Sequence, residues 1–235
     1  MPQYTMRHTE YSKKYAVIIV GGGHGSRMES DIPKQFMLLK ERPVLMHTIE
    51  AFYRSELKPQ IIVVLHIDFH VYWEEACKKY HFDIPHQLVK GGNERFYSVK
   101  NGLKAIKVPT VIAIHDAVRP LVSNEIITAS FLQAELNKSA VTAIRSTDSV
   151  RQAFNDTSIA LNRDDIYLIQ TPQAFKSDIL RKAYQCPYRI EFTDDASVVE
   201  KSGTPIKLIK GERKNIKITF PEDLLLAEFY LSADK

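Results

Sequence analysis

Residues 15–35 read Tyr-Ala-Val-Ile-Ile-Val-Gly-Gly-Gly-His-Gly-Ser-Arg-Met-Glu-Ser-Asp-Ile-Pro-Lys-Gln, a short apolar run that leads into a glycine-rich turn. Four of the nine glycines of the chain lie in this turn, between Gly21 and Gly25. Glycine lets the backbone bend sharply and expose its N–H groups, and such a turn can cradle a phosphate. Arg27 and Lys34 add two positive side chains to the same stretch. The stretch therefore predicts a strand followed by a phosphate-binding loop.

The rest of the chain alternates short apolar runs with amphipathic segments. Runs typical of strands are residues 15–20, 61–66, 87–90, 111–115, 141–144, 206–209 and 216–219. Helices are expected from Pro43, after Asn93 and Ser123 as N-caps, and from Pro221. This alternation is typical of an α/β fold with a mostly parallel, twisted sheet and helices on both faces. Ligands of such sheets bind at the carboxyl ends of the strands, where the glycine-rich turn lies.

One segment, at about residues 146–175, interrupts the alternation. Val150–Phe154, a turn at 155–158 and Ile166–Gln170 together predict a β-hairpin. An inserted hairpin has little core of its own, so we expect it to form an arm that packs on a second subunit. The expected organisation is a loose polar tail over residues 1–14 and one domain over residues 15–235 that includes the arm.

Composition limits the classes of function. The chain has 235 residues, 44% of them hydrophobic and 26% charged, and a net charge of +4. Its basic residues are spread along the chain, so no nucleic-acid partner is expected. The apolar run at 15–20 is too short for a signal peptide or a membrane span, so no membrane partner is expected either. Cys77 and Cys186 have no metal or redox spacing and are expected to be reduced, which favours the cytoplasm.

The glycine-rich turn has other interpretations. Gly21 and Gly23 match the first two glycines of the dinucleotide pattern G-x-G-x-x-G, but Ser26 occupies the third position. The P-loop string G-x-x-x-x-G-K-[ST] does not occur in the chain. An ordinary turn between a strand and a helix, with basic neighbours by chance, is the simplest alternative.

Three later strings also follow strands or lie within them. Gly-Gly-Asn-Glu-Arg-Phe-Tyr-Ser at 91–98 opens a helix, where backbone donors converge, although an ordinary capped helix explains it equally well. Asp116 directly follows the run at 111–115, where a buried carboxylate needs a cation, a metal or a ligand. Either Mg²⁺ or a salt bridge to Arg119 would satisfy it. Lys217, within the run at 216–219, either points to solvent or meets an anion.

Seven strings occur in a fixed order along the chain. They are Gly-x-Gly-x-Arg-Met at 23–28, Pro-Lys-Gln at 33–35, Gly-Gly-x-Glu-Arg-x-x-Ser-Val at 91–99, His-Asp-Ala-x-Arg-Pro at 115–120, Thr-Pro-Gln at 171–173, Thr-Asp-Asp-Ala-Ser at 193–197 and Asn-Ile-Lys-Ile-Thr at 215–219. Together they resemble the 2-C-methyl-D-erythritol 4-phosphate cytidylyltransferase family of the non-mevalonate isoprenoid pathway, over about residues 15–231. The resemblance implies a Rossmann-like nucleotidyltransferase fold and transfer of CMP from CTP to methylerythritol phosphate. It also implies Mg²⁺, or another divalent metal, and a homodimer whose active site is completed by the partner's arm.

The resemblance also implies the roles of individual residues. The catalytic residues would be Arg27, Lys34, Arg163 and Lys217. The nucleotide would be bound by Gly21, Gly22, Gly23, Gly25, Gly92, Asn93, Ser98 and Ala117. The second substrate would be bound by Asp116, Arg119, Ser149, Arg163, Thr171, Thr193 and Lys217. Asp116 is also the candidate metal ligand, with Mg²⁺ held mainly by the oxygens of the triphosphate.

The chain departs from the family pattern at three places. Val-Gly-Gly-Gly at 20–23 replaces the usual Pro-Ala-Ala-Gly, Asn93 replaces a common aspartate, and Ser149 replaces a common threonine. A ribitol 5-phosphate cytidylyltransferase, which shares the first loop and the string at 115–120, is an alternative function. A nucleotide-binding regulatory protein without activity is a more distant one. Ser26 argues against a third, a dinucleotide oxidoreductase.

Overall fold

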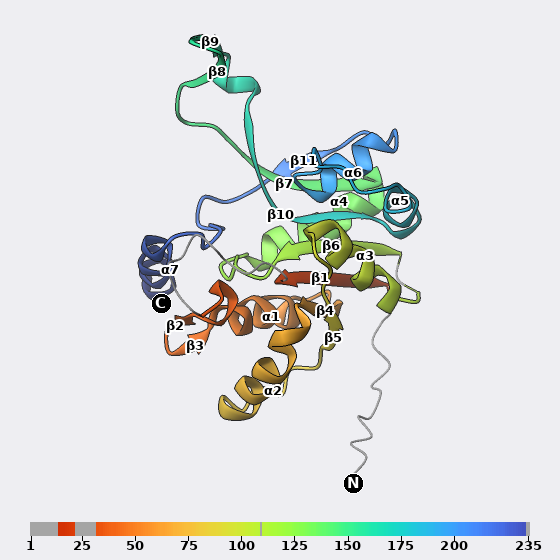
Figure 1. Ribbon diagram of the computed structural model, residues 1–235, viewed down its shortest axis with the longest axis vertical. Helices are drawn as coiled ribbons and strands as arrows, with labels where there is room; N and C mark the ends of the chain where they lie inside the picture. The colour runs from red at the N-terminus through yellow and green to blue at the C-terminus, as the bar shows by residue number, and fades with distance from the viewer. Residues whose placement is uncertain (1–13, 22–31, 109, 234–235) are drawn as a thin grey trace.

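A seven-stranded sheet crosses the molecule in the order β11-β7-β10-β6-β1-β4-β5 (Figure 1). The computed structural model describes residues 14–21, 32–108 and 110–233. The strands of the main sheet are β1 (Tyr15–Gly21), β4 (Gln60–Leu65), β5 (Gln87–Lys90), β6 (Val111–Asp116), β7 (Ser139–Arg145), β10 (Tyr167–Lys176) and β11 (Leu208–Lys210). Two short ribbons are formed by β2 (Leu38–Leu39) with β3 (Arg42–Pro43) and by β8 (Val150–Phe154) with β9 (Thr157–Leu161).

Most neighbouring strands of the main sheet are parallel, as the sequence predicts. β5, β4, β1 and β6 run in one direction, and β7 and β11 are parallel to each other. β10 is antiparallel to both of its neighbours, β6 and β7. The predicted α/β class with a mostly parallel sheet is therefore confirmed.

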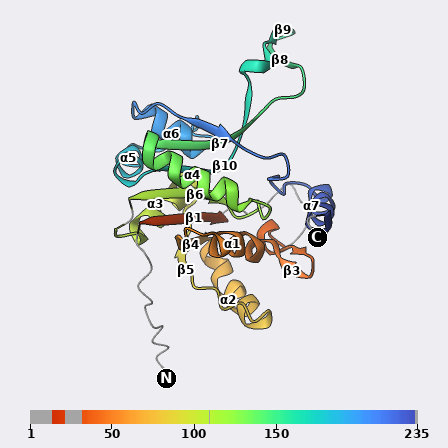
Figure 2. The same ribbon diagram turned by 180° about the vertical axis from the view of Figure 1, so that it is seen from behind.

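Helices cover both faces of the sheet, as Figures 1 and 2 show from opposite sides. The helices are α1 (Val44–Arg54), α2 (His70–Lys79), α3 (Arg95–Ala105), α4 (Asn124–Asn137), α5 (Ser177–Ala183), α6 (Asp195–Lys201) and α7 (Pro221–Ala233). Side chains of α1, α2 and α4 pack with Val17 and Ile19 of β1, whereas those of α3, α5 and α6 pack with Ala16 and Ile18. Alternate residues of β1 thus face opposite layers, and a strand buried on both faces needs a continuous apolar sequence.

Several local predictions are confirmed and others are wrong. The side chain of Ser123 caps α4 by accepting from the N–H of Ile126, and α7 begins at Pro221. Pro43, however, is the N-cap of α1, and Glu94 rather than Asn93 is the N-cap of α3.

Residues 216–219 do not form the predicted strand. They lie outside the sheet, and the N–H of Ile218 donates to the carbonyl of Val118 instead. The apolar alternation there reflects packing of Ile218 between Leu121 and α7.

The predicted hairpin exists, but its second strand is wrong. β8 pairs with β9, which begins at Thr157 within the predicted turn, whereas Ile166–Gln170 falls largely in β10 of the main sheet. The arm stands well away from the sheet in both views (Figure 2). Of the expected tail, residues 1–13 lie outside the described residues, and Lys14 forms an ion pair with Glu135 at 2.9 Å. Among the helices of the described residues, none has the length and apolar character to cross a membrane.

Candidate active site

Two adjoining pockets lie at the carboxyl ends of β1 and β6. The first, of about 320 Å³, is bordered by the end of β1, by Lys34 and by the loop before α3. The second, of about 240 Å³, is bordered by the middle of β10 and the loop before α6. Arg95, Asp116 and Lys217 border both pockets and form the wall between them. Two ligands bound in these pockets would therefore meet at this charged wall.

The first pocket brings together four of the eight residues predicted to bind the nucleotide with one predicted catalytic residue. The four are Gly21, Gly92, Asn93 and Ser98, and the catalytic residue is Lys34. Lys34 begins a short 3-10 helix directly after Pro33, and its Nζ donates to the carbonyl of Thr219 at 2.9 Å. Proline restricts the backbone at this point, and the hydrogen bond to Thr219 holds the ammonium group at the edge of the pocket.

Gly92 lies where no side chain fits. A Cβ at this position would be 2.3 Å from the Cβ of Tyr97. The N–H of Gly92 donates to Oγ of Ser98 at 3.0 Å, and Ser98 is itself buried in the first turns of α3. The backbone of the 91–94 loop therefore lies against the start of a helix, where N–H groups favour anions.

Asp116 is a buried carboxylate surrounded by cations. Its Oδ2 lies 3.1 Å from Nζ of Lys217 and 3.3 Å from Nε of Arg119, and its Oδ1 lies 3.6 Å from Nη2 of Arg95. Burial raises the pKa of this carboxyl, but the charges of Arg95, Lys217 and Arg119 outweigh that effect and hold the pKa well below its usual range. Asp116 is therefore ionised at neutral pH. The predicted salt bridge to Arg119 is present, within a larger cluster.

The second pocket brings together residues predicted to bind the second substrate. Arg119, Thr171 and Thr193 border it, with Gln170, Gln173 and Asp194 beside them. Arg119 is only 8% exposed, and its Nη1 donates to the carbonyl of Asn215 at 2.8 Å. A guanidinium fixed in this way presents a directed positive charge to an anionic ligand.

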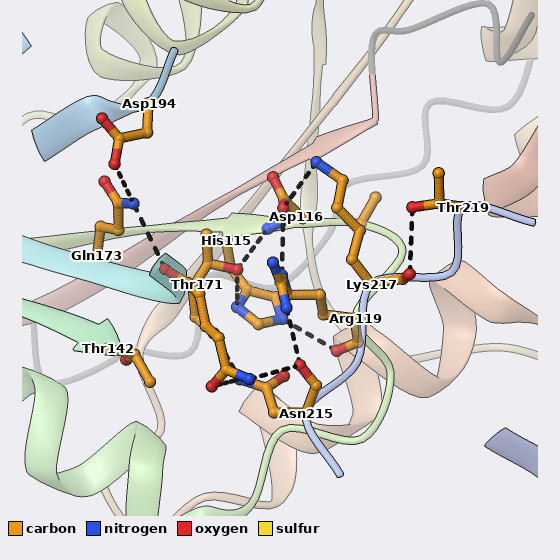
Figure 3. A network of polar contacts seen from close by, with 12 residues as sticks. His115, Asp116, Arg119, Thr142, Thr171, Gln173, Asp194, Asn215, Lys217 and Thr219 are labelled. Carbon is orange, nitrogen blue, oxygen red and sulfur yellow. Dashed lines mark hydrogen bonds and ion pairs between the residues drawn. The ribbon is translucent and has the colours of Figure 1, made fainter. Parts of the chain in front are cut away.

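An irregularity in β10 aims side chains into this pocket. Ile169 pairs with Ala143 and Gln173 with Val141, so β10 contains extra residues between these pairs. Bulges of this kind redirect side chains. Thr171 lies at the bulge, and its Oγ1 accepts a hydrogen bond from the backbone N–H of Asp116 at 3.1 Å (Figure 3).

His115 is buried below the charged wall, on β6. Its Nε2 faces the carbonyl of Arg119 at 3.1 Å, and its Nδ1 faces Oγ1 of Thr171 at 2.9 Å (Figure 3). A carbonyl accepts and cannot donate, so Nε2 carries the proton and Nδ1 accepts from Thr171. Burial lowers the pKa of His115 to about 4, so the ring is neutral and acts as a fixed support.

Some predicted residues line neither pocket. Ala117 lies beneath the first pocket, where its Cβ would be 3.1 Å from a Cβ at Gly21. Ser149 directly precedes β8, and Arg163 begins the short helix after β9; both are exposed near the arm. Gly22, Gly23, Gly25 and Arg27 lie outside the described residues.

The sequence did not single out several residues of the charged network. Arg95 donates to Oδ2 of the fully buried Asp195 at 2.7 Å, and Tyr184 donates to Oδ1 of the same carboxylate at 2.6 Å. Asn215 and Gln173 tie neighbouring segments together. All except Tyr184 lie within the seven strings, so those strings held the signal, but sequence alone did not separate their structural residues from ligand contacts.

The described residues limit how a metal could bind. Within them, no three histidine, cysteine or acidic side chains gather closely enough to hold an ion. Asp116 and Glu94 are the carboxylates that border the first pocket. Mg²⁺ is commonly held by one or two carboxylates together with substrate phosphates, and the pocket fits that mode.

Comparison with known proteins identifies the family. A sequence model of the 2-C-methyl-D-erythritol 4-phosphate cytidylyltransferase family matches residues 15–233. Enzymes of that name from Azobacteroides pseudotrichonymphae and Bacteroides fragilis are 50% and 46% identical to this chain, covering 92% and 91% of it and 98% of each relative. The crystal structure of 4-diphosphocytidyl-2C-methyl-D-erythritol synthase from Anaerococcus prevotii has a TM-score of 0.80 at 30% identity, over 94% of this chain and 98% of that one. The chain belongs to the 2-C-methyl-D-erythritol 4-phosphate cytidylyltransferase family.

Proposed function

We propose that the two pockets transfer CMP from CTP to 2-C-methyl-D-erythritol 4-phosphate, giving 4-diphosphocytidyl-2-C-methyl-D-erythritol and pyrophosphate for isoprenoid synthesis. The observation that carries the proposal is the wall of Arg95, Asp116 and Lys217, which borders both pockets. The reaction must bring two anionic substrates together, and fixed cations between their sites offset the repulsion. We place CTP in the first pocket and the acceptor in the second.

The chemistry requires charge stabilisation rather than proton abstraction. An oxygen of the acceptor phosphate attacks the α-phosphorus of CTP and forms a new P–O bond. The bond from that phosphorus to the bridging oxygen breaks, and its electron pair leaves with pyrophosphate. The acceptor phosphate has a second pKa of about 6, so it is largely ionised at neutral pH and needs no general base.

We assign roles by position around the pockets. Lys34 stabilises the charge that develops on the phosphoryl oxygens, together with Arg27, whose role rests on the resemblance alone. Lys217 binds the acceptor phosphate. We propose that the nucleotide is held by Gly21, Gly22, Gly23, Gly25, Gly92, Asn93, Ser98 and Ala117, and the acceptor by Asp116, Arg119, Ser149, Thr171 and Thr193. The roles of Gly22, Gly23, Gly25, Ala117 and Ser149, which lie outside the described residues or line neither pocket, also rest on the resemblance. The short contacts at the 91–94 loop support a close approach of the backbone to the nucleotide.

Mg²⁺, or another divalent metal, is the proposed cofactor. Asp116 is the residue proposed to contact the metal, and the oxygens of the triphosphate would supply most of its other ligands. When bound, the metal shares the negative charge of the leaving pyrophosphate. Lys217 and Arg119 already neutralise Asp116, so this carboxylate would be a secondary ligand.

The functional unit is proposed to be a homodimer in the cytoplasm. Phe154, Ile159 and Leu168 are exposed apolar side chains on or beside the arm, and a second copy of the chain would bury them. The partner's arm would then bring its Arg163 to the acceptor pocket. Sedimentation velocity is expected to give a dimer, and a fully active monomer would contradict the arm's role.

Cys77 and Cys186 form no disulfide, which agrees with a reducing compartment.

A turnover assay with CTP tests the proposed reaction. Pyrophosphate release is measured with methylerythritol phosphate and, separately, with ribitol 5-phosphate as acceptor. We expect a higher kcat/KM with methylerythritol phosphate. A better rate with ribitol 5-phosphate would overturn the assigned acceptor, and CTP binding without pyrophosphate release would point to a regulatory protein.

A further inference from the structure

Lys217 lies on a segment, residues 215–219, that borders both pockets without being part of the sheet. Its side chain is about half exposed, whereas Asn215, two residues earlier, is fully buried. Such a long, mobile side chain needs a fixed backbone if its ammonium group is to meet a ligand in one place.

The side chain of Asn215 ties the segment to the bulge of β10. Its Nδ2 donates to the carbonyl of Thr171 at 2.8 Å (Figure 3). Its Oδ1 is buried and has no hydrogen-bond partner among the residues that the structure describes. Because a buried polar atom without a partner is costly, the amide is poorly explained as a packing residue. Its short donation to Thr171, together with a longer one to Oε1 of Gln170 at 3.5 Å, accounts for its presence.

The backbone of Asn215 fixes a second cation. Its carbonyl accepts from Nη1 of Arg119 at 2.8 Å and from Nε2 of Gln170 at 3.3 Å. Arg119 and Lys217 both reach Oδ2 of Asp116, at 3.3 and 3.1 Å. One buried residue thus connects the bulge, Arg119 and the segment that carries Lys217.

The nucleotide side has anchors of its own. Lys34 contacts the segment at its far end, through the carbonyl of Thr219. That end is held separately, by the N–H of Ile218 on Val118 and by the N–H of Thr219 on Oδ2 of Asp223 at 2.7 Å. Loss of the Asn215 contacts is therefore expected to loosen the acceptor side first.

We infer that Asn215 is a positioning residue for the acceptor: it sets the places of Arg119 and Lys217 and thereby the binding of the acceptor phosphate. This inference rests on the proposed function, in which those two cations meet the acceptor. It assigns Asn215 no direct contact with either substrate.

Steady-state kinetics of Asn215→Ala tests the inference. We expect the KM for methylerythritol phosphate to rise about tenfold, as for loss of a buried hydrogen bond whose partner is left unsatisfied, while the KM for CTP stays within about twofold. Asn215→Asp keeps the shape but cannot donate to the carbonyl of Thr171, so the same asymmetry is expected. Asn215→Ser, which keeps a smaller donor, is expected to recover part of the acceptor affinity and serves if the alanine variant does not fold.

A matched control separates positioning from loss of stability. Ser139 is fully buried and ties β7 to the carbonyl of Pro205 and the N–H of Lys207, and it borders neither pocket. Ser139→Ala is expected to lower the free energy of unfolding without changing either KM. Equal rises of both KM values in Asn215→Ala, or no change in either, would overturn the inference. If the wild type shows no turnover, the proposed function fails, and calorimetric Kd values for CTP and methylerythritol phosphate still decide the role of Asn215.

Discussion

Lys34 is the described residue that we propose to stabilise the transition state. Its Nζ is held at the edge of the first pocket by the carbonyl of Thr219. We predict that Lys34→Ala lowers kcat by about 10²-fold, the loss typical of one group that stabilises developing negative charge. Initial rates with both substrates saturating measure this effect.

The control for Lys34 removes an equal charge elsewhere. Lys104 is exposed near the end of α3, and Lys104→Ala is expected to leave kcat unchanged. An effect of Lys34→Ala confined to KM would mean that the residue binds both the ground state and the transition state equally, contrary to its assigned role.

Gly92 lies where the structure leaves no room for a side chain. The Cβ of alanine would lie 2.3 Å from the Cβ of Tyr97, so the loop before α3 must move. We predict that Gly92→Ala raises the KM for CTP about tenfold and costs about 1–3 kcal/mol of stability, as overpacking does. Gly203→Ala is the control, because Gly203 has a φ of +91° and open space around it. It is expected to cost stability through strain while the KM for CTP stays the same.

Among the elements, those with local signals were predicted best. β1 is a continuous apolar run, and α4 begins at a serine cap. Only the first part of β10 was predicted as a strand, and with the wrong partner, because its irregularity and Pro172 break the alternation within one strand. The turn predicted at 155–158 identified the arm, but the actual turn is shorter. β9 begins at Thr157, so β8 pairs with this adjacent segment rather than with Ile166–Gln170.

In the candidate site, too, the residues with a local sequence signal were predicted and those defined by distant contacts were not. Motif spacing identified Asp116, Lys217 and Arg119, because charged residues next to apolar runs need an explanation. Asn215 and Asp195 were not assigned to the site, because their importance lies in contacts with Thr171, Arg119 and Arg95 that join distant segments. Sequence order alone does not reveal such contacts without the fold.

The arm that carries Arg163 can be tested by combining two inactive variants in one dimer. If Arg163 acts in the partner's acceptor pocket, Arg163→Ala and Lys34→Ala damage different halves of each composite site. We predict that each homodimer is nearly inactive, and that mixed dimers regain up to about half of the activity per dimer, since one of their two sites is intact. Rates are measured after subunit exchange, with mixed dimers verified by differential tags. No recovery in verified mixed dimers would show that Arg163 acts within its own subunit.

At the scale of the whole molecule, folding buries several histidines in their neutral form. Burial lowers the pKa values of His47, His86 and His115, the last to about 4. The unfolded chain, with histidine pKa values of about 6.5, therefore binds protons first as the pH falls. The histidines contribute stability that is fully present above about pH 6.5 and is lost progressively below it.

His86 offers the clearest test, because it contacts the single tryptophan of the chain. Nε1 of Trp73 donates to Nε2 of His86 at 2.9 Å, so Nδ1 carries the proton and donates to the carbonyl of Ile84 at 2.7 Å. Protonation would turn Nε2 into a second donor facing Trp73. We predict that the free energy of unfolding rises between about pH 5 and 7, with at most about 1.4 kcal/mol per pH unit from each histidine. His86→Gln, which still accepts from Trp73, should flatten this rise, whereas His81→Gln at an exposed position should not. Urea unfolding followed by tryptophan fluorescence measures the slopes, and identical slopes for wild type and His86→Gln would show that His86 does not couple folding to pH.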